Sequence, residues 1–187
     1  DEAGIERASL CGVSIGGMAS LWVAATAPER VDRLILCCTS AHPGAPEVWA
    51  RRAATVRTDG MEAVADVVVR RWFPHAWAER HREVVDALRA SLVAIPPEGY
   101  AAACEALIGL DLRPFLPRVR AATMIIAGAQ DPAFPVSHAR ELADGISGSR
   151  PVIIAAAAHL ANVQCPREVA DLMSDHLAAV PRTRPDA

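Results

Sequence analysis

A five-residue pattern around one serine constrains this chain more than any other feature. Gly12-Val13-Ser14-Ile15-Gly16 matches G-x-S-x-G and lies between an apolar run at 8–12 and an alanine-rich stretch at 15–27. Such a pattern can arise by chance, but a preceding strand and a following helix form the sharp turn that exposes a nucleophilic serine hydroxyl. The helix start directs free N–H groups to the same point. We therefore predict Ser14 as a nucleophile, with the backbone N–H of Ile15 stabilising an oxyanion.

Further short apolar runs predict an α/β fold with a mostly parallel sheet flanked by helices. Strands are expected at 33–38, 123–127 and 152–155, with helices at 136–143 and 166–179. Continuous apolar runs of this length are typical of strands buried on both faces. Pro166 opens the last helix, because proline is favoured at the first helical position.

A long segment between the second and third predicted strands has a helical residue pattern and not a strand pattern. Residues 46–120 show helical periodicity and hold Trp49, Trp72 and Trp77, and a segment this long is too helical for a plain loop. We expect a lid over the carboxyl edge of the sheet, where open α/β folds bind ligands. The predicted division is therefore 1–44 for the nucleophile part of the core, 45–120 for the lid, 121–180 for the remaining core and 181–187 for a tail or linker.

A serine nucleophile needs a base, and the base needs an orienting acid. With a serine at such a turn, the acid and then the histidine follow later in the chain. Asp131 follows the strand at 123–127, and His159 follows the strand at 152–155, so both are candidates. A turn aspartate before proline and a histidine at a strand end are the structural alternatives, and Asp144 is the fallback acid. Lid or surface positions are expected for the other histidines: His42, His75, His81, His138 and His176.

Composition excludes several other classes of function. The chain has 187 residues, 52% of them hydrophobic, a net charge of −3 and arginine as its only strongly basic residue. No apolar run approaches the roughly 20 residues that span a bilayer, no signal peptide is found, and no basic aromatic-rich cluster suggests nucleic-acid binding. Histidine and cysteine spacing predicts no metal site. Five cysteines suggest small core residues in a reducing cytoplasm, with Cys37 and Cys38 on opposite strand faces.

The motifs resemble those of one enzyme family in detail. Residues 10–18 resemble the nucleophile turn of the 3-oxoadipate enol-lactonases, which have the α/β-hydrolase fold, and residues 27–37 resemble the segment that follows it. Lid segments 71–73 and 96–100 are also similar, as are the acid loop at 127–132 and the histidine loop at 156–163. The turn, acid and histidine motifs are shared across α/β-hydrolases. The lid segments and the rest of the histidine loop are the features that point to the enol-lactonases among them.

This resemblance implies a lactone hydrolase of aromatic-compound breakdown through the β-ketoadipate pathway. Its triad would be Ser14, Asp131 and His159, with no cofactor and a small lactone as substrate. The substrate carries a carboxylate, for which Arg70 and Arg71, with Trp72 as an apolar wall, are candidates. A general carboxylesterase, a haloperoxidase-like enzyme and a non-catalytic fragment remain alternative interpretations.

Two departures from the family pattern carry expectations of their own. The resemblance implies that the first strands of the sheet, and a loop giving a second oxyanion donor, precede the segment equivalent to Asp1, so we expect this sequence to lack them. Gln164-Cys165 stands where an acidic residue is expected. Some related lactonases are fused to a carboxymuconolactone decarboxylase, and the tail at 181–187 could begin such a linker. The sequence predicts no oligomeric state.

Overall fold

A twisted parallel sheet forms the centre of the molecule. The structure is a computed structural model that describes residues 4–179. Within that range the sheet has four strands, ordered along the chain as β1 (Ala8–Val13), β2 (Val31–Cys37), β3 (Ala122–Gly128) and β4 (Arg150–Ile154). All neighbouring pairs are parallel, with Leu36 of β2 beside Gly12 on one side and Ile125 on the other. The predicted α/β class is confirmed.

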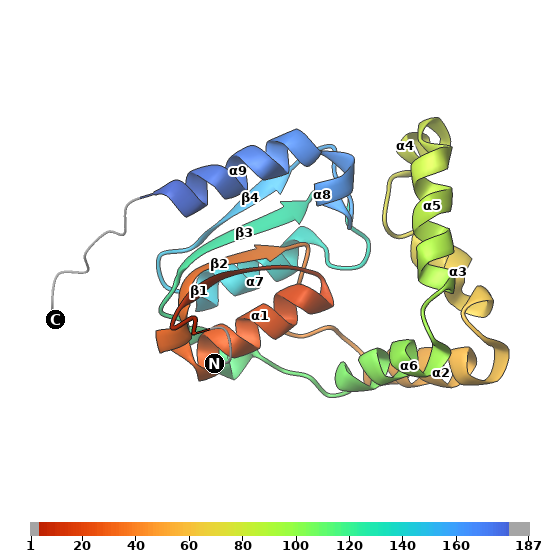
Figure 1. Ribbon diagram of the computed structural model, residues 1–187, viewed down its shortest axis with the longest axis horizontal. Coiled ribbons are helices and arrows are strands. Elements are labelled where there is room, and N and C mark those ends of the chain that lie inside the picture. The colour runs from red at the N-terminus through yellow and green to blue at the C-terminus, as the bar shows by residue number, and fades with distance from the viewer. Residues whose placement is uncertain (1–3, 180–187) are drawn as a thin grey trace, which may run out of the picture.

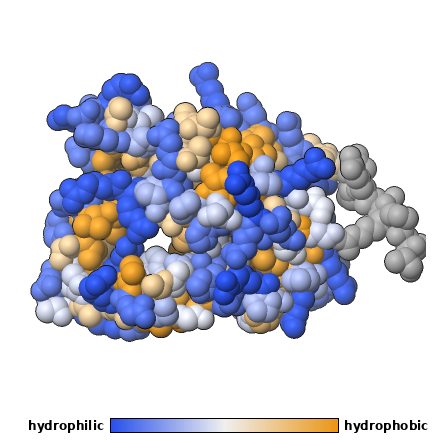
Figure 2. Space-filling model, turned by 180° about the vertical axis from the view of Figure 1, so that it is seen from behind, coloured by the Kyte–Doolittle hydropathy of each residue, from blue (hydrophilic) through white to orange (hydrophobic). Residues whose placement is uncertain are grey.

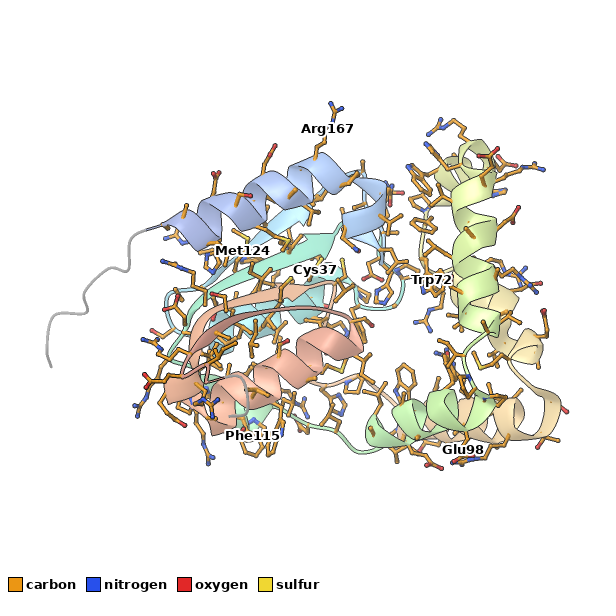
Figure 3. All side chains as sticks on the ribbon, viewed as in Figure 1. Cys37, Trp72, Glu98, Phe115, Met124 and Arg167 are labelled. Carbon is orange, nitrogen blue, oxygen red and sulfur yellow. The ribbon has the colours of Figure 1, made fainter. Side chains whose placement is uncertain are left out.

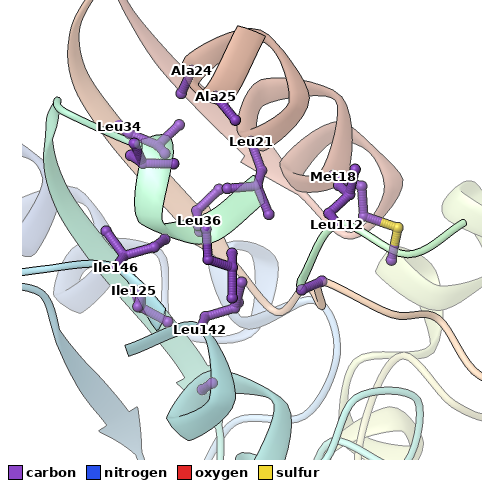
Figure 4. Packing of buried hydrophobic residues seen from close by; sticks show 14 of the residues in the cluster. Met18, Leu21, Ala24, Ala25, Leu34, Leu36, Leu112, Ile125, Leu142 and Ile146 are labelled. Carbon is purple, nitrogen blue, oxygen red and sulfur yellow. The ribbon is translucent and has the colours of Figure 1, made fainter. Parts of the chain in front are cut away.

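Alternating residues of β2 show how the sequence builds two cores. Leu34 and Leu36 lie in one cluster with α1 (Ile15–Thr26) and α7 (Val136–Gly145), which cover one face of the sheet (Figure 4). Ile35 and Cys37 face the opposite side, where α9 (Pro166–Ala178) packs. Figure 1 shows this layering, with α9 on one side of the strands and α1 and α7 on the other. Successive strand side chains alternate between faces, so helices on both faces require apolar residues at nearly every position.

Helices α2 to α6 form a separate layer at the carboxyl ends of the strands (Figure 1). These are α2 (Pro46–Asp59), α3 (Glu62–Val69), α4 (His75–Arg80), α5 (Arg82–Val93) and α6 (Pro97–Ala106). Their buried side chains, including Val56, Ala65 and Leu92, form a cluster of their own. Proline stands at the first position of α2 and α6, as it does in α9, because its missing N–H has no helical partner there.

The chain returns from these helices to the sheet through the 3₁₀ helix η2 (Arg113–Arg118). Leu112, Leu116 and Val119 pack in the core cluster of α1 and α7, although they fall within the predicted lid. The division at residue 120 stays a prediction. The predicted tail at 181–187 lies outside the described residues.

Most predicted elements agree with the structure to within two residues at each end. Outside the predicted lid, two short elements were not predicted. They are the 3₁₀ helix η1 (Pro28–Arg30), within the stretch where the first helix was expected to close, and α8 (Ala161–Gln164), which begins two residues after His159. The expectation for Cys37 and Cys38 was wrong, because their Sγ atoms lie 3.9 Å apart in one cluster. β2 ends at Cys37 and Cys38 has φ 43°, so strand alternation no longer applies. No helix within residues 4–179 is long and apolar enough to cross a membrane.

Candidate active site

Ser14 occupies the turn between β1 and α1 in a strained backbone conformation. Its φ is 55° and its ψ is −122°, which is rare for a residue with a side chain. Its N–H donates to Cys37 O at 3.0 Å, and Thr39 Oγ1 donates to Ser14 O at 2.6 Å. Neighbouring segments therefore hold the turn from both sides. Ile15 begins α1, where backbone N–H groups have no intrahelical acceptor.

The two glycines of the motif have different roles from those the pattern suggests. A Cβ at Gly12 would lie 2.1 Å from Gly16 O, so only glycine permits this close approach. A Cβ at Gly16 would meet no described atom within 4 Å. Steric crowding therefore requires glycine at position 12 of the motif, whereas the described residues give no steric reason for glycine at position 16.

Ser14, His159 and Asp131 form a continuous hydrogen-bonded series. His159 Nε2 lies 3.0 Å from Ser14 Oγ, and His159 Nδ1 lies 2.8 Å from Asp131 Oδ2. The Asp131 side chain is fully buried and that of His159 is 8% exposed. Asp131 Oδ1 accepts hydrogen bonds from the backbone N–H groups of Ala133, at 2.7 Å, and Phe134, at 3.1 Å. The carboxylate is thus fixed by its own loop and can orient the imidazole.

Close packing between two loops positions the acid and the histidine. Gly128 ends β3, and a Cβ there would lie 2.3 Å from Ala158 O, so glycine lets the loop before His159 approach. Gln164 accepts a hydrogen bond from Ala158 N at 2.9 Å and donates to Ala156 O. Leu160 N donates to Trp72 O at 3.1 Å, which joins the histidine loop to the lid. The departure at Gln164 therefore supports the loop that carries His159.

A cavity of about 490 Å³ lies between the sheet and helices α2 to α6. Figure 2 shows the surface hollowed between these two parts. Ser14 and His159 line this cavity together with apolar side chains of the lid. Its lining residues are Val13, Ser14, Ile15, Pro43, Ala45, Val48, Trp49, Arg52, Val68, Arg71, Trp72, Leu92, Tyr100, Ala103, Cys104, Leu107, Ala133, Phe134, His159 and Leu160. The size and apolar walls suit a small organic ligand.

The candidate lid residues divide into two groups. Arg71 and Trp72 line the cavity, and Figure 3 shows Trp72 between the lid and the sheet. Arg70 is exposed and does not line it, so that candidate was wrong. Arg52 and Tyr100 also line the cavity but were not predicted. A sequence signal existed for Arg52, because it lies three residues after Trp49 on the inward face of α2.

The alternative histidines and acid lie away from this series. Asp144 is exposed on α7, and His159 is the one histidine among the residues that line the cavity. His138 Nδ1 instead pairs with Ser40 Oγ at 2.7 Å. His176 lies at the surface of α9 with its side chain half-buried, and its Nε2 is 3.1 Å from Ala122 O. Residues 4–179 contain no histidine, cysteine or acidic cluster able to hold a metal ion.

Comparison with known proteins places this geometry in a family. Residues 1–166 match the family described as alpha/beta hydrolase fold. The chain is 36% identical to 3-oxoadipate enol-lactonase 2 of Acinetobacter baylyi over 167 residues, which cover 89% of this chain and 62% of that enzyme. The chain thus spans less than two thirds of this relative's length.

Solved structures agree with the sequence relatives. The enol-lactonase from Burkholderia xenovorans LB400 superposes with a TM-score of 0.91 at 38% identity, covering 95% of this chain and 68% of that one. A thermophilic esterase from Thermogutta terrifontis gives a TM-score of 0.86 at 29% identity, covering 92% and 65%. The resemblance to the enol-lactonases is therefore confirmed over most of the chain. Its parallel sheet, its turn around Ser14 and its matched residues show that the chain belongs to the α/β-hydrolase fold family.

Proposed function

We propose that this chain carries the catalytic machinery of a serine hydrolase that opens 3-oxoadipate enol-lactone to 3-oxoadipate. The observation that carries the proposal is the series Ser14–His159–Asp131, with separations of 3.0 and 2.8 Å, at the wall of a ligand-sized cavity. The similarity to two enol-lactonases supports the choice of substrate. In this proposal Ser14 is the nucleophile, His159 the general base and acid, and Asp131 the orienting carboxylate.

The proposed reaction begins at the lactone carbonyl. Ser14 Oγ attacks the carbonyl carbon while His159 Nε2 takes the hydroxyl proton, and Asp131 stabilises the imidazolium. The tetrahedral oxyanion lies against the backbone N–H of Ile15 at the start of α1. The ring C–O bond then breaks, and the enol oxygen leaves with its electron pair and takes the proton from His159. The enol relaxes to a ketone, which makes it a good leaving group.

Hydrolysis of the acyl-enzyme completes the cycle. His159, again neutral, takes a proton from a water molecule that attacks the ester carbonyl on Ser14. The second tetrahedral intermediate collapses, Ser14 recovers its proton, and the open-chain acid leaves. Proton transfer in both halves uses the same Nε2 atom, which lies 3.0 Å from Ser14 Oγ. Asp131, with three hydrogen bonds to its carboxylate, keeps the proton on Nδ1 throughout.

A general carboxylesterase is the second candidate. The similarity to the Thermogutta terrifontis esterase favours it, and a triad of serine, histidine and aspartate is also able to hydrolyse simple esters. The two candidates differ in what fills the cavity, so substrate preference separates them. A cytoplasmic location and a fusion to a decarboxylase stay predictions.

An assay of enol-lactone hydrolysis tests the proposal, with the loss of the lactone's ultraviolet absorbance as the signal. Wild-type chain should turn over the lactone faster than simple aryl esters, and Ser14→Ala should reduce this rate at least about 10³-fold. Gly99→Ala is a matched control, because a Cβ at Gly99 meets no described atom within 4 Å. Preference for aryl esters without lactone turnover would favour the esterase. Lactone turnover that survives Ser14→Ala would contradict the proposed nucleophile.

A further inference from the structure

The carbonyl oxygen of Ser14 accepts three hydrogen bonds from the described residues. Two come from α1 itself, from Gly17 N at 2.9 Å and Met18 N at 3.2 Å, as is usual for the carbonyl that caps a helix start. The third comes from Thr39 Oγ1 at 2.6 Å. Within residues 4–179, Thr39 is the one hydrogen-bond donor to this oxygen from outside α1. Thr39 lies two residues after Cys37, where β2 ends, so it joins the nucleophile turn to the sheet.

The position of the Thr39 hydroxyl is fixed by its surroundings. Thr39 is buried, with 4% of its surface exposed. On one side of it the N–H of Cys38 donates to Ile126 O of β3 at 2.8 Å, and on the other side Ser40 Oγ accepts from His42 N at 2.9 Å. Threonine is β-branched, so a buried threonine has few allowed values of χ1. The hydroxyl therefore keeps one place relative to β2 and β3.

Gly17 leaves the space for this contact. A Cβ at Gly17 would lie 2.7 Å from Thr39 Cβ and Cγ2 and 2.8 Å from Thr39 Oγ1. Because Thr39 is stiff and buried, it could not accommodate a methyl group there and keep its hydrogen bond to Ser14 O. A Cβ at Gly16, in contrast, would meet no described atom within 4 Å. The glycine that follows the G-x-S-x-G pattern thus has a steric reason, and that reason is Thr39.

The hydrogen bond from Thr39 acts on the peptide unit that joins Ser14 to Ile15. A peptide bond is planar and trans, so its C=O and N–H point in opposite directions within one rigid plane. Fixing the Ser14 carbonyl therefore also fixes the direction of the Ile15 N–H, the proposed oxyanion donor. A hydrogen bond to the carbonyl also polarises the amide and strengthens its N–H as a donor. The plane follows from Ser14 ψ of −122° in a strained turn, which persists only with support from outside.

We propose that Thr39 is a positioning residue that orients the Ile15 N–H toward the oxyanion, in the space that Gly17 leaves. The described lining of the cavity includes Ser14, Ile15 and His159 but not Thr39, so Thr39 acts through the peptide unit and not on the substrate. This inference rests on the proposed function, because it concerns the oxyanion step at that same site. Charge develops on the oxygen only as the carbonyl is attacked, so loss of the Thr39 hydroxyl should lower kcat more than it changes KM.

Ester hydrolysis tests this role in any reaction that depends on Ser14. In Thr39→Val a methyl group replaces the hydroxyl, and kcat for 4-nitrophenyl butyrate should fall at least about fivefold while KM changes by less than about twofold. Gly17→Ala, which displaces Thr39, should lower kcat in the same way. Thr39→Ser keeps the hydroxyl and should retain at least about half of the wild-type kcat. Thr26→Val is the matched control, because it removes an exposed hydroxyl of α1 that donates to Trp22 O at 2.7 Å, and it should leave kcat within about twofold.

Binding of a transition-state analogue adds a readout that a merely structural role would not change. Trifluoromethyl butyl ketone forms a bond between its carbonyl carbon and Ser14 Oγ, while the Oγ proton passes to His159 and the carbonyl electron pair becomes an oxyanion. Methyl butyl ketone has a similar shape and binds without developing this charge. The preference for the trifluoromethyl ketone, measured as the ratio of the two dissociation constants, should fall at least about fivefold in Thr39→Val.

The outcomes distinguish the role of Thr39 from the proposed function. An unchanged ketone preference in Thr39→Val, or an equal loss in Thr39→Ser, would overturn the role of Thr39. If Thr39→Val does not fold, Thr39→Ala takes its place beside Thr39→Ser, because these two variants differ by one hydroxyl. A wild-type chain that hydrolyses the ester through Ser14 but does not open the enol-lactone would overturn the proposed function alone. A wild-type chain with neither ester hydrolysis nor a ketone preference would overturn both.

Discussion

Substitution of Asp131 separates orientation of His159 from stability of the fold. In Asp131→Asn the amide oxygen can still accept hydrogen bonds from the N–H groups of Ala133 and Phe134. In the wild-type chain these two nitrogens lie 2.7 and 3.1 Å from Asp131 Oδ1. The NH₂ group would then face His159 Nδ1, which must become an acceptor. The imidazole proton moves to Nε2, 3.0 Å from Ser14 Oγ, so Nε2 can no longer take the serine proton. Activation of Ser14 should fall about 10⁴-fold, equivalent to about 5.5 kcal/mol.

Asp131→Ala should lose the same activation and destabilise the fold as well. It leaves the buried N–H of Phe134 and the partly buried N–H of Ala133 without their acceptor. A buried donor without an acceptor costs about 1–3 kcal/mol and a partly buried one up to that amount, so the free energy of unfolding should fall by about 1–6 kcal/mol. Asp131→Asn keeps those two hydrogen bonds, so its free energy of unfolding should fall by no more than about 3 kcal/mol.

Two measurements on the same proteins check this reasoning. The rate of Ser14 labelling by a fluorophosphonate reports activation of the nucleophile without any choice of substrate, and urea unfolding reports stability. Asp144→Asn is the matched control, because Asp144 is exposed on α7 and should change neither quantity. A labelling rate in Asp131→Asn within about tenfold of wild type would refute the orienting role. Equal stability of the Asn and Ala variants would refute the hydrogen-bond argument.

Three further predictions concern stability. Gly128→Ala should destabilise the chain, because its Cβ would lie 2.3 Å from Ala158 O, and a lower unfolding midpoint than in Gly99→Ala would show it. Leu36→Ala should lower the free energy of unfolding by about 2–5 kcal/mol in urea, whereas exposed Val67→Ala should change it by less than about 0.5 kcal/mol. Burial lowers the pKa of His176, so the unfolded chain binds that proton more readily and stability should fall as pH drops below about 6.5. Urea unfolding at about pH 7.5 and pH 5 should show a smaller decrease in His176→Asn, and an unchanged decrease would contradict this assignment.

The nucleophile turn and the strands were predictable because their signals are local. Buried strands of a parallel sheet are apolar at successive positions, and a strand, a glycine-bounded serine and a helix follow each other directly in the sequence. The order of Ser14, Asp131 and His159 also follows from where each strand ends. Their separations could not be predicted, because these depend on how the loops after β3 and β4 pack against each other.

The lid was harder to interpret because adjacent arginines look alike in sequence. Arg71 faces the cavity and Arg70 is exposed. Which of the two faces inward depends on how the chain packs after α3 ends, and this cannot be predicted from the sequence. Arg52 could have been found from its place on the apolar stripe of α2, had the boundaries of that helix been known. The role of Gln164 was hidden because its partners, Ala156 and Ala158, become neighbours only when the chain folds back through α8.

The acyl-enzyme provides the most direct test of the account. Because ring opening expels no fragment, wild-type chain quenched during turnover of the enol-lactone should gain the full mass of the lactone. Peptide mapping should place that addition on Ser14, and Ser14→Ala should show none. An adduct on another residue, or lactone hydrolysis by Ser14→Ala at the wild-type rate, would contradict the central claim.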